Sequence, residues 1–304
     1  MDAKTINNIM TALTSFCKLK GSQNKGAKAL GISNAQVSNI LNGKHDNITD
    51  DFWRNLSAKL GLSREGERTW QVAETKAYTQ MSFCISNSQE SSLTMAVTGT
   101  AGIGKTEAIE VYVSEHANAY HLCCSEYWNK KTFLSELLKC MGEDSCGSSV
   151  PDMVEDVING LKRKDRPVII MDEADKLSDS VLYFFISIYN RLEDRCGIML
   201  VATDHLAKRI NKGVRNNKKG YQEIFSRLGR KFISLPALDE EDIATVCHVN
   251  GMTDAKAVKA LVNDLKRDSQ VDLRRVKRVV WAWVKSHAET QSTEETENTE
   301  EEAA

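Results

Sequence analysis

Long apolar runs are absent from this sequence, and their absence limits where the protein can act. No stretch among the 304 residues approaches the roughly 18 consecutive apolar residues that a membrane helix needs. The first residues also lack the pattern of a secretory signal peptide. We therefore expect a cytoplasmic protein with no membrane partner.

Paired metal-ligand and disulfide patterns are also lacking. The eight cysteines include no C-x-x-C pair, and the six histidines show no ligand spacing. Several cysteines lie inside apolar runs, which is typical of reduced core thiols in a cytosolic protein. We expect neither a disulfide framework nor a Cys/His metal cluster.

Positive charge is missing from the last part of the chain. Residues 288–304 contain seven glutamates and no Lys or Arg, so removing them changes the formal net charge from −2 to +5. Few large apolar residues occur there, and we predict a disordered acidic tail over 288–304. Such a tail can mimic DNA, contact a partner or keep the protein soluble.

A phosphate-binding loop is the strongest signal that is present. The run G-T-A-G-I-G-K-T at 99–106 follows a predicted strand, Leu93–Thr98, and precedes a predicted helix, Glu107–Ala117. Lys105 can reach the β- and γ-phosphates of a nucleoside triphosphate, and the Thr106 hydroxyl can ligate Mg²⁺. The predicted nucleotide-binding residues are Gly99, Thr100, Ala101, Gly102, Ile103, Gly104, Lys105, Thr106 and Glu107.

Two carboxylates follow an apolar strand about seventy residues later. Val168–Met171 leads directly into Asp172 and Glu173, the arrangement known as Walker B. Asp172 can hold Mg²⁺ through water, and Glu173 can orient the attacking water for hydrolysis. The string D-E-A-D also occurs in helicases, but the chain has no second RecA-like domain.

Alternating strands and helices between residues 90 and 236 predict an α/β core. Its strands lack polar residues at their centres, which indicates a parallel five-stranded sheet covered on both faces. Three helical patterns then predict a C-terminal helical lid over 237–287.

Further polar residues follow the predicted core strands. Thr203 ends the fourth strand and is a candidate γ-phosphate sensor, with Asp204 as its alternative. Arg227 precedes the fifth strand and is a candidate finger that reaches a neighbouring subunit's nucleotide, with Arg230 as runner-up. Arg274, with Arg275 competing, could bring the lid onto the nucleotide. The predicted catalytic residues are Lys105, Glu173, Thr203 and Arg227.

Residues 1–62 form a predicted helix-turn-helix domain. Gly31 suits the turn, Ser33 or Asn34 can cap the second helix, and Val37 and Ile40 face inward. The domain carries eight Lys/Arg against four Asp/Glu, which favours nucleic acid over the alternative of a protein-binding hairpin. The predicted DNA contacts are Asn34, Gln36, Ser38 and Asn39. Residues 63–89 are predicted as a linker with a lead-in helix.

A second basic region spans 208–231, with nine Lys/Arg and one acidic residue. Its interleaved Gly and Asn residues predict a flexible loop or hairpin. Contact with DNA phosphates is the favoured interpretation, and a solvated surface is the alternative. The candidate contacts are Lys212, Arg215, Lys218 and Lys219.

Taken in order, these motifs resemble those of the AAA+ ATPases of the phage Mu transposition protein B group. The resemblance covers nearly everything before the acidic tail, through G-T-A-G-I-G-K-T, V-I-I-M-D-E-A-D, G-I-M-L-V-A-T-D-H, I-F-S-R-L and D-L-R-R-V. Members of this group often have asparagine where Thr203 stands, which makes a sensor role for Thr203 less secure.

The resemblance implies a function as well as a fold. It implies ATP with Mg²⁺ as the cofactor, a helical filament on double-stranded DNA with little sequence preference, and delivery of that DNA to a transposase whose strand transfer is stimulated. It also implies a phage or mobile-element protein in a bacterial host. Two alternatives stay open: a helicase loader or replication initiator, and an ATP-responsive helix-turn-helix transcriptional regulator.

Overall fold

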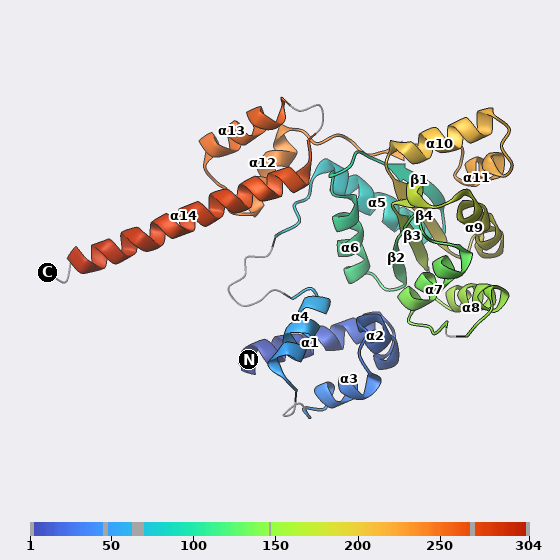
Figure 1. The fold of residues 1–304 in the computed structure, drawn as a ribbon, viewed down its shortest axis with the longest axis horizontal. Coiled ribbons are helices and arrows are strands. Elements are labelled where there is room, and N and C mark those ends of the chain that lie inside the picture. The colour runs from blue at the N-terminus through green and yellow to red at the C-terminus, as the bar shows by residue number, and fades with distance from the viewer. Residues whose placement is uncertain (1–2, 45–47, 63–69, 146, 268–270, 302–304) are drawn as a thin grey trace. The chain divides into compact units, whose positions relative to one another are not determined.

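The computed structural model describes residues 3–44, 48–62, 70–145, 147–267 and 271–301, with side-chain burial described up to residue 287. The chain divides into two compact units (Figure 1). The first unit comprises Met1–Thr69, Ser82–Thr98 and Ile109–Ser234, and the second comprises Trp70–Met81, Gly99–Ala108 and Leu235–Ala304. No helix in the described part of the chain is both long and apolar enough to cross a membrane.

A five-stranded parallel sheet forms the centre of the first unit. Its strand order is β2-β3-β4-β1-β5. The strands are β1 (Thr94–Thr98), β2 (Ala119–Cys123), β3 (Val168–Asp172), β4 (Gly197–Ala202) and β5 (Phe232–Ser234). Since all five run the same way, their carboxyl ends meet at one edge of the sheet. The predicted five-stranded parallel sheet is confirmed.

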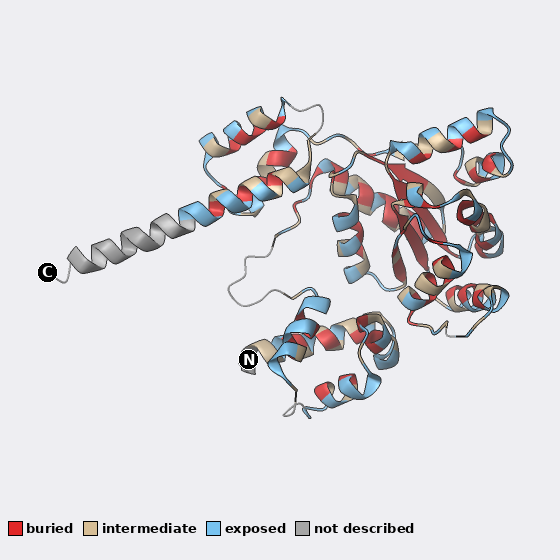
Figure 2. Cartoon of the chain, in the orientation of Figure 1, coloured by how far each residue is buried: buried red, intermediate tan, exposed pale blue. Residues whose placement is uncertain are grey.

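The central strands are apolar because both faces of the sheet are covered. Every residue of β3 and β4 is buried, including Asp172 at the end of β3, and the strands are red in Figure 2. A strand buried on both sides reads as a continuous apolar run rather than an alternating one. Sequence alone therefore located β3 and β4 to within one residue of their observed ends.

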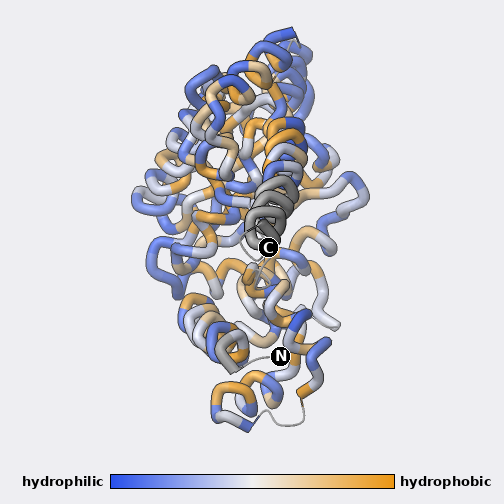
Figure 3. Tube along the Cα trace, turned by 90° about the vertical axis from the view of Figure 1, so that its left-hand side faces the viewer, coloured by the Kyte–Doolittle hydropathy of each residue, from blue (hydrophilic) through white to orange (hydrophobic). Residues whose placement is uncertain are grey.

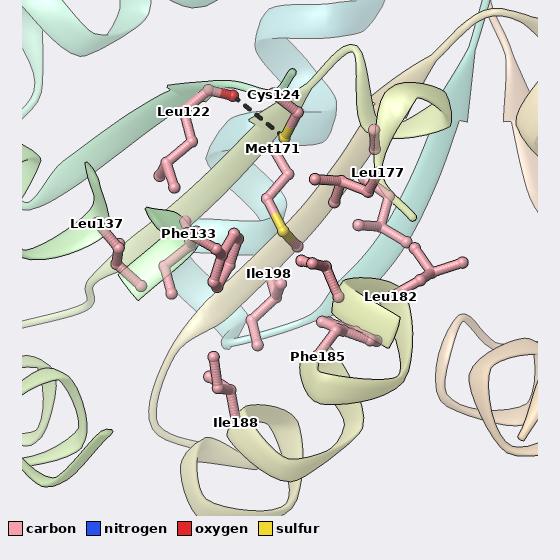
Figure 4. Close-up of a cluster of buried hydrophobic side chains, with 14 of the residues drawn as sticks. Leu122, Cys124, Phe133, Leu137, Met171, Leu177, Leu182, Phe185, Ile188 and Ile198 are labelled. Carbon is pink, nitrogen blue, oxygen red and sulfur yellow. Dashed lines mark hydrogen bonds between the residues drawn. The ribbon is translucent and has the colours of Figure 1, made fainter. Parts of the chain in front are cut away.

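Three helices cover one face of the sheet: α7 (Lys130–Met141), α8 (Val150–Lys162) and α9 (Asp179–Leu192). In Figure 4, Phe133 of α7 and Phe185 of α9 lie with Met171 and Ile198 of the strands in one apolar cluster. Figure 1 shows α5 (Lys76–Ser91) and α6 (Lys105–Glu115) at the opposite face. Each helix is divided between the two units: the part of α5 in the first unit begins at Ser82, and the part of α6 in the first unit begins at Ile109.

The basic region is helical, which corrects the predicted flexible loop. It consists of α10 (Asp204–Arg215) and α11 (Tyr221–Arg227), joined by a short turn. Leu206 and Ile210 are both fully buried, four residues apart on one face of α10. This amphipathic spacing stabilises the helix despite the basic residues on its outer face, and the Gly and Asn residues obscured the pattern.

Two glycines in this helical pair are required for close packing rather than for flexibility. A Cβ on Gly213 would lie 2.3 Å from Cδ1 of Tyr221. Gly220 has φ of +80°, and a Cβ there would lie 1.6 Å from Cε1 of Tyr183. The two tyrosine rings meet edge to face, with centroids 6.1 Å apart. These contacts fix α11 against α9 and α10.

Residues 3–62, as far as they are described, fold into four helices around an apolar cluster that includes Leu13, Val37, Ile40 and Trp53. The helices are α1 (Ala3–Leu19), α2 (Gln23–Leu30), α3 (Asn34–Leu41) and α4 (Asp50–Lys59). Hydrophobic and hydrophilic stretches alternate along helices of the chain (Figure 3), as expected when one side of each helix is buried.

The second unit contains α12 (Glu240–Val249), α13 (Ala255–Leu265) and α14 (Leu273–Glu301). Ala73, from the segment before α5, joins their core. In the segment predicted as a linker with a lead-in helix, 63–89, the structure has the helix α5 from Lys76 onward, while 63–69 lie outside the described residues.

The acidic segment is continuous with α14, which is assigned as far as Glu301, and 302–304 lie outside the described residues. Disorder of 288–304 stays a prediction. The sequence from Leu273 onward contains neither Gly nor Pro, so nothing interrupts a helix that packing has already started.

We predict that Gly220→Ala destabilises the protein more than Gly229→Ala. Both glycines have positive φ, but no described atom lies within 4 Å of a Cβ on Gly229. The control therefore has backbone strain alone, about 1 kcal/mol, whereas Gly220→Ala adds overpacking against Tyr183 of about 1–3 kcal/mol. Urea unfolding of both variants measures the difference, and equal losses of stability would contradict the packing explanation.

Candidate functional site

The phosphate-binding loop lies between β1 and α6. β1 ends at Thr98, and α6 begins at Lys105, so the helix amides point into the loop. The Lys105 Nζ donates to the carbonyl oxygens of Gly99 at 2.8 Å and Thr100 at 2.9 Å. The loop carbonyls thus hold the Lys105 ammonium group in place. A bound phosphate could accept the same N–H donors instead of these carbonyls.

Gly102 of this loop packs against the start of α14 within the second unit. Its φ is +75°, and a Cβ there would lie 2.0 Å from Oδ1 of Asp272. The Leu273 N–H donates to the Gly102 carbonyl oxygen at 2.9 Å. The loop glycine therefore makes room for a carboxylate as well as for phosphate oxygens, which the sequence motif did not reveal.

The two competing lid arginines are distinguished by their contacts. Arg275 Nη2 donates to Asp264 Oδ2 at 2.5 Å, which commits its guanidinium to α13. The Arg274 side chain is exposed, and its backbone N–H donates to Asp272 Oδ1 at 2.8 Å. Arg274 remains the better candidate for a nucleotide contact.

The Walker B carboxylates occupy different environments at the end of β3. Asp172 is 1% exposed, and its Oδ1 accepts from the Glu173 N–H at 2.8 Å. Glu173 has a left-handed backbone, with φ of 54°, and its Oε2 accepts from Lys176 Nζ at 2.6 Å. A buried carboxylate suits metal binding, and a half-exposed one suits water activation.

Two side chains on β2 lie beside these carboxylates and were missed from the sequence. His121 Nε2 is 3.7 Å from Asp172 Oδ2 and, among the described residues, has no hydrogen-bond partner. Cys123 Sγ lies 3.6 Å from Glu173 Oε2. The parallel register, which pairs Cys123 with Asp172, was the signal that could have found them.

The two carboxylates also affect the thiol of Cys123. Burial, together with the nearby Glu173 and Asp172 carboxylates, raises the pKa of its thiol. This shift disfavours the thiolate, which is the form of cysteine that acts as a nucleophile.

Mg²⁺ fits the oxygen donors that the sequence predicted. Within the described ranges, no three His, Cys, Asp or Glu side chains gather into a metal cluster. Mg²⁺ does not need one, because it commonly binds through one or two protein oxygens, waters and substrate phosphates. Thr106, in the second unit, carries a hydroxyl of this kind, and Asp172, in the first unit, carries a carboxylate.

The candidate sensor Thr203 is bonded to the segment after Walker B. Its Oγ1 donates to Asp175 Oδ2 at 2.7 Å. Its alternative, Asp204, is exposed in the first turn of α10. Thr203 therefore joins the end of β4 to the turn that follows β3.

The candidate finger Arg227 is held within its own subunit. Its Nε and Nη2 donate to Asn190 Oδ1 at 3.0 and 2.8 Å, and its guanidinium lies 5.4 Å from the Tyr189 ring centroid. Arg230 is exposed and has a left-handed backbone, with φ of 55°. Reaching a neighbour would require Arg227 to leave Asn190, so Arg230 stays in contention.

The helix-turn-helix has the expected local geometry. Gly31 ends α2 with φ of 62°, and Ser33 caps α3 in a reciprocal capping box with Gln36. Because Gln36 Oε1 accepts from the Ser33 N–H at 2.9 Å, part of this amide is committed to the cap. Asn34 and Asn39 are exposed, and Ser38 is half-buried.

Three of the four predicted basic contacts are exposed on or after α10: Lys212, Arg215 and Lys219. The fourth, Lys218, is also exposed but pairs with Asp179 at the start of α9. The cations therefore form one basic surface with an internal ionic contact at its edge.

Comparison with known proteins agrees with this arrangement. Residues 88–210 match the AAA domain family, and residues 17–66 match a helix-turn-helix family. The Mu-like prophage FluMu DNA transposition protein B of Haemophilus influenzae is 25% identical over 243 residues, which cover 77% of this chain and 82% of that protein. Residues 88–210 thus match an AAA domain, and the chain is similar to transposition protein B.

A solved structure, described as Drosophila ORC bound to DNA, is also similar to this chain. The sequence identity is 13% and the TM-score is 0.46. The match covers 69% of this chain, which spans 55% of that chain's length.

We predict energetic coupling between Gly102 and Asp272. Asp272→Ala removes the acceptor for the Arg274 N–H and costs about 1 kcal/mol, as for removal of a helix cap. Gly102→Ala should cost less in the Asp272→Ala background than in the wild type, because the clashing carboxylate is gone. A double-mutant cycle by urea unfolding should give a coupling of about 0.5 kcal/mol or more. Strict additivity would contradict the contact.

Proposed function

We propose that this AAA+ protein binds and hydrolyses ATP while assembled on double-stranded DNA, and that it presents the DNA to a transposase. Subunits form a filament with little sequence preference, because the contacts are with phosphates. The filament stimulates strand transfer by the transposase, and hydrolysis then releases the protein. Similarity to a protein named for DNA transposition supports the transposase as partner.

The observation that carries this proposal is where the basic surface begins. β4 ends at Ala202, and α10 starts two residues later at Asp204. β3 ends at Asp172 at the carboxyl edge of the sheet, and β1 leads into the phosphate loop at the same edge. The chain therefore enters the basic helices from this edge as well. One sheet edge thus serves nucleotide chemistry and phosphate-backbone binding.

In the proposed reaction, each residue acts through its own chemistry. Lys105 and the loop amides would hold the triphosphate, and Thr106 and Asp172 would hold Mg²⁺, which would supply positive charge against the phosphates. Glu173 leaves Lys176 and orients the attacking water. Arg227 of an adjacent subunit, or Arg230 in its place, stabilises the transferred phosphoryl group.

Nucleotide at the subunit interface explains why assembly should depend on ATP. A finger contact to the γ-phosphate exists only while that phosphate is present, so hydrolysis removes a contact between neighbours. The equilibrium then shifts toward release from DNA.

The capped α3 helix favours one second candidate, a transcriptional regulator that reads an operator. Its exposed Asn34 and Asn39 are suitable for base edges. Nuclease footprinting discriminates between the two: a discrete protected site supports the regulator, and uniform protection that grows with ATP supports the filament.

We predict that Glu173→Gln binds ATP normally but hydrolyses it about 10²–10⁴-fold more slowly, the usual contribution of a positioned base. The variant should therefore stay on DNA when ATP is present. Single-turnover hydrolysis and filter binding of labelled DNA test both effects. Glu126→Gln, an exposed residue just after β2, is the matched control, and wild-type turnover by Glu173→Gln would remove Glu173 from catalysis.

Neutralising the exposed basic surface should weaken DNA binding in a salt-dependent way. The triple variant Lys212→Ala, Arg215→Ala and Lys219→Ala should reduce the slope of log affinity against log salt by about 0.9 for each DNA phosphate that is no longer neutralised.

The control removes the same charge from three exposed residues of α13 and its end: Lys256, Lys259 and Arg267. Fluorescence anisotropy with one duplex at several salt concentrations gives both slopes. Equal slopes for the two triple variants would show that net charge, and not this surface, determines binding.

A further inference from the structure

A cluster around Asp179 connects the basic helices to the segment that follows Walker B. Asp179 is the first residue of α9. Its Oδ1 accepts from Arg209 Nη2 at 2.5 Å and from the Tyr221 hydroxyl at 2.7 Å. Its Oδ2 accepts from Lys218 Nζ. One carboxylate thus receives donors from α10, from α11 and from the turn between them.

The two cations on Asp179 differ in their access to solvent. The Arg209 side chain is 27% exposed, whereas that of Lys218 is 54% exposed. Burial alone would raise the pKa of Asp179, but the hydrogen bonds from Lys218, Tyr221 and Arg209 hold it well below its ordinary value. Asp179 is therefore a permanent anion at neutral pH, and Lys218 is its outer, exchangeable partner.

Arg209 extends this contact inward to the main chain. Its Nη1 donates to the carbonyl oxygens of Asp175 at 3.2 Å and Leu177 at 2.7 Å. Asp175 also accepts from Thr203. A single guanidinium thus restrains the short segment that begins immediately after Glu173.

The same segment carries the cation that holds Glu173. Lys176 lies in the 3-10 turn Ala174–Lys176, and its Nζ is 2.6 Å from Glu173 Oε2. Movement of this turn would change how firmly Lys176 holds Glu173. Lys218, Asp179, Arg209 and Lys176 therefore form a connected series from the basic surface to Glu173.

We propose that Asp179 forms with Lys218 the ion pair that a DNA phosphate would otherwise form, and that DNA binding breaks the Lys218–Asp179 pair. A backbone phosphate competes with Asp179 for the exposed ammonium. Once Lys218 moves to DNA, Asp179 retains Arg209 and Tyr221 alone, and the restraint on residues 174–179 changes. Arg209 and Lys218 are positioning residues that act on Glu173 through this segment.

This inference depends on the proposed function, since it requires both DNA binding and ATP hydrolysis. It adds a specific regulation: the Lys218–Asp179 pair keeps hydrolysis slow in the absence of DNA. Its energetic basis is the exchange of one charge-assisted hydrogen bond for another, which shifts the balance between two states of the segment.

The first test measures the kcat for ATP of the full-length protein without DNA. Lys218→Ala should raise this DNA-free kcat toward the DNA-saturated wild-type value, by about fivefold or more, the low end of typical coupling between sites. Lys218→Arg, which can still pair with Asp179, should restore the low value. Lys131→Ala, an exposed residue of α7, controls for removal of a lysine.

An unchanged or lowered DNA-free kcat in Lys218→Ala would overturn the inference. Circular dichroism and the melting temperature establish that each variant is folded. A purely structural role for Lys218 would lower kcat together with the melting temperature, and the predicted rise in kcat is the opposite result.

The second test uses Arg209→Lys. This variant keeps the positive charge but loses the planar guanidinium group that donates to two carbonyl oxygens. The ratio of DNA-saturated to DNA-free kcat should fall toward one, while the KM for ATP stays near the wild-type value. A wild-type ratio in this variant would contradict the route through Arg209.

Failure of the inference can be distinguished from failure of the proposed function. If the wild-type protein does not bind a DNA duplex in anisotropy, or does not hydrolyse ATP, the proposed function fails. If the wild type does both but Lys218→Ala and Arg209→Lys respond to saturating DNA as the wild type does, the inference alone fails.

Discussion

The parallel register of β3, β4 and β1 is the constraint on which the rest of the site depends. Parallel strands place their carboxyl ends at one edge, and the observed register pairs β3 with β4 and β4 with β1 so that these ends lie side by side. The phosphate loop, the Walker B pair, Thr203 and α10 all follow from strand ends at this edge. In the proposed function, nucleotide chemistry and DNA contact share this edge because the chain has to leave each strand there.

Paired charges are the second recurring device. Lys176 holds Glu173, and Lys218 holds Asp179, in both cases as a partly exposed lysine on an acidic group. Exposed ion pairs of this kind contribute little to stability, typically about 0–1 kcal/mol. They can therefore exchange partners when a phosphate arrives, which is what the proposed assembly on DNA and later release require.

The sequence was sufficient for the sheet and for the phosphate loop, because buried parallel strands and glycine-rich turns have local signatures. It was insufficient where tertiary contacts decide the structure. Gly213 and Gly220 suggested a flexible loop, yet each makes room for a tyrosine ring. His121 lies beside Asp172 only through the register of β2, and Asp272 meets Gly102 across a large sequence separation. Of the candidate site residues, Arg227 and Lys218 proved to be held by partners that no local pattern shows.

We expect nucleotide and DNA to bind cooperatively to this protein. The most direct measurement is the affinity of the full-length protein for one labelled duplex, determined by fluorescence anisotropy at a single salt concentration. It should be made without nucleotide and with Mg²⁺ plus a slowly hydrolysed ATP analogue. We expect tighter and more cooperative binding with the analogue, and identical binding curves in the two conditions would contradict nucleotide-dependent assembly on DNA.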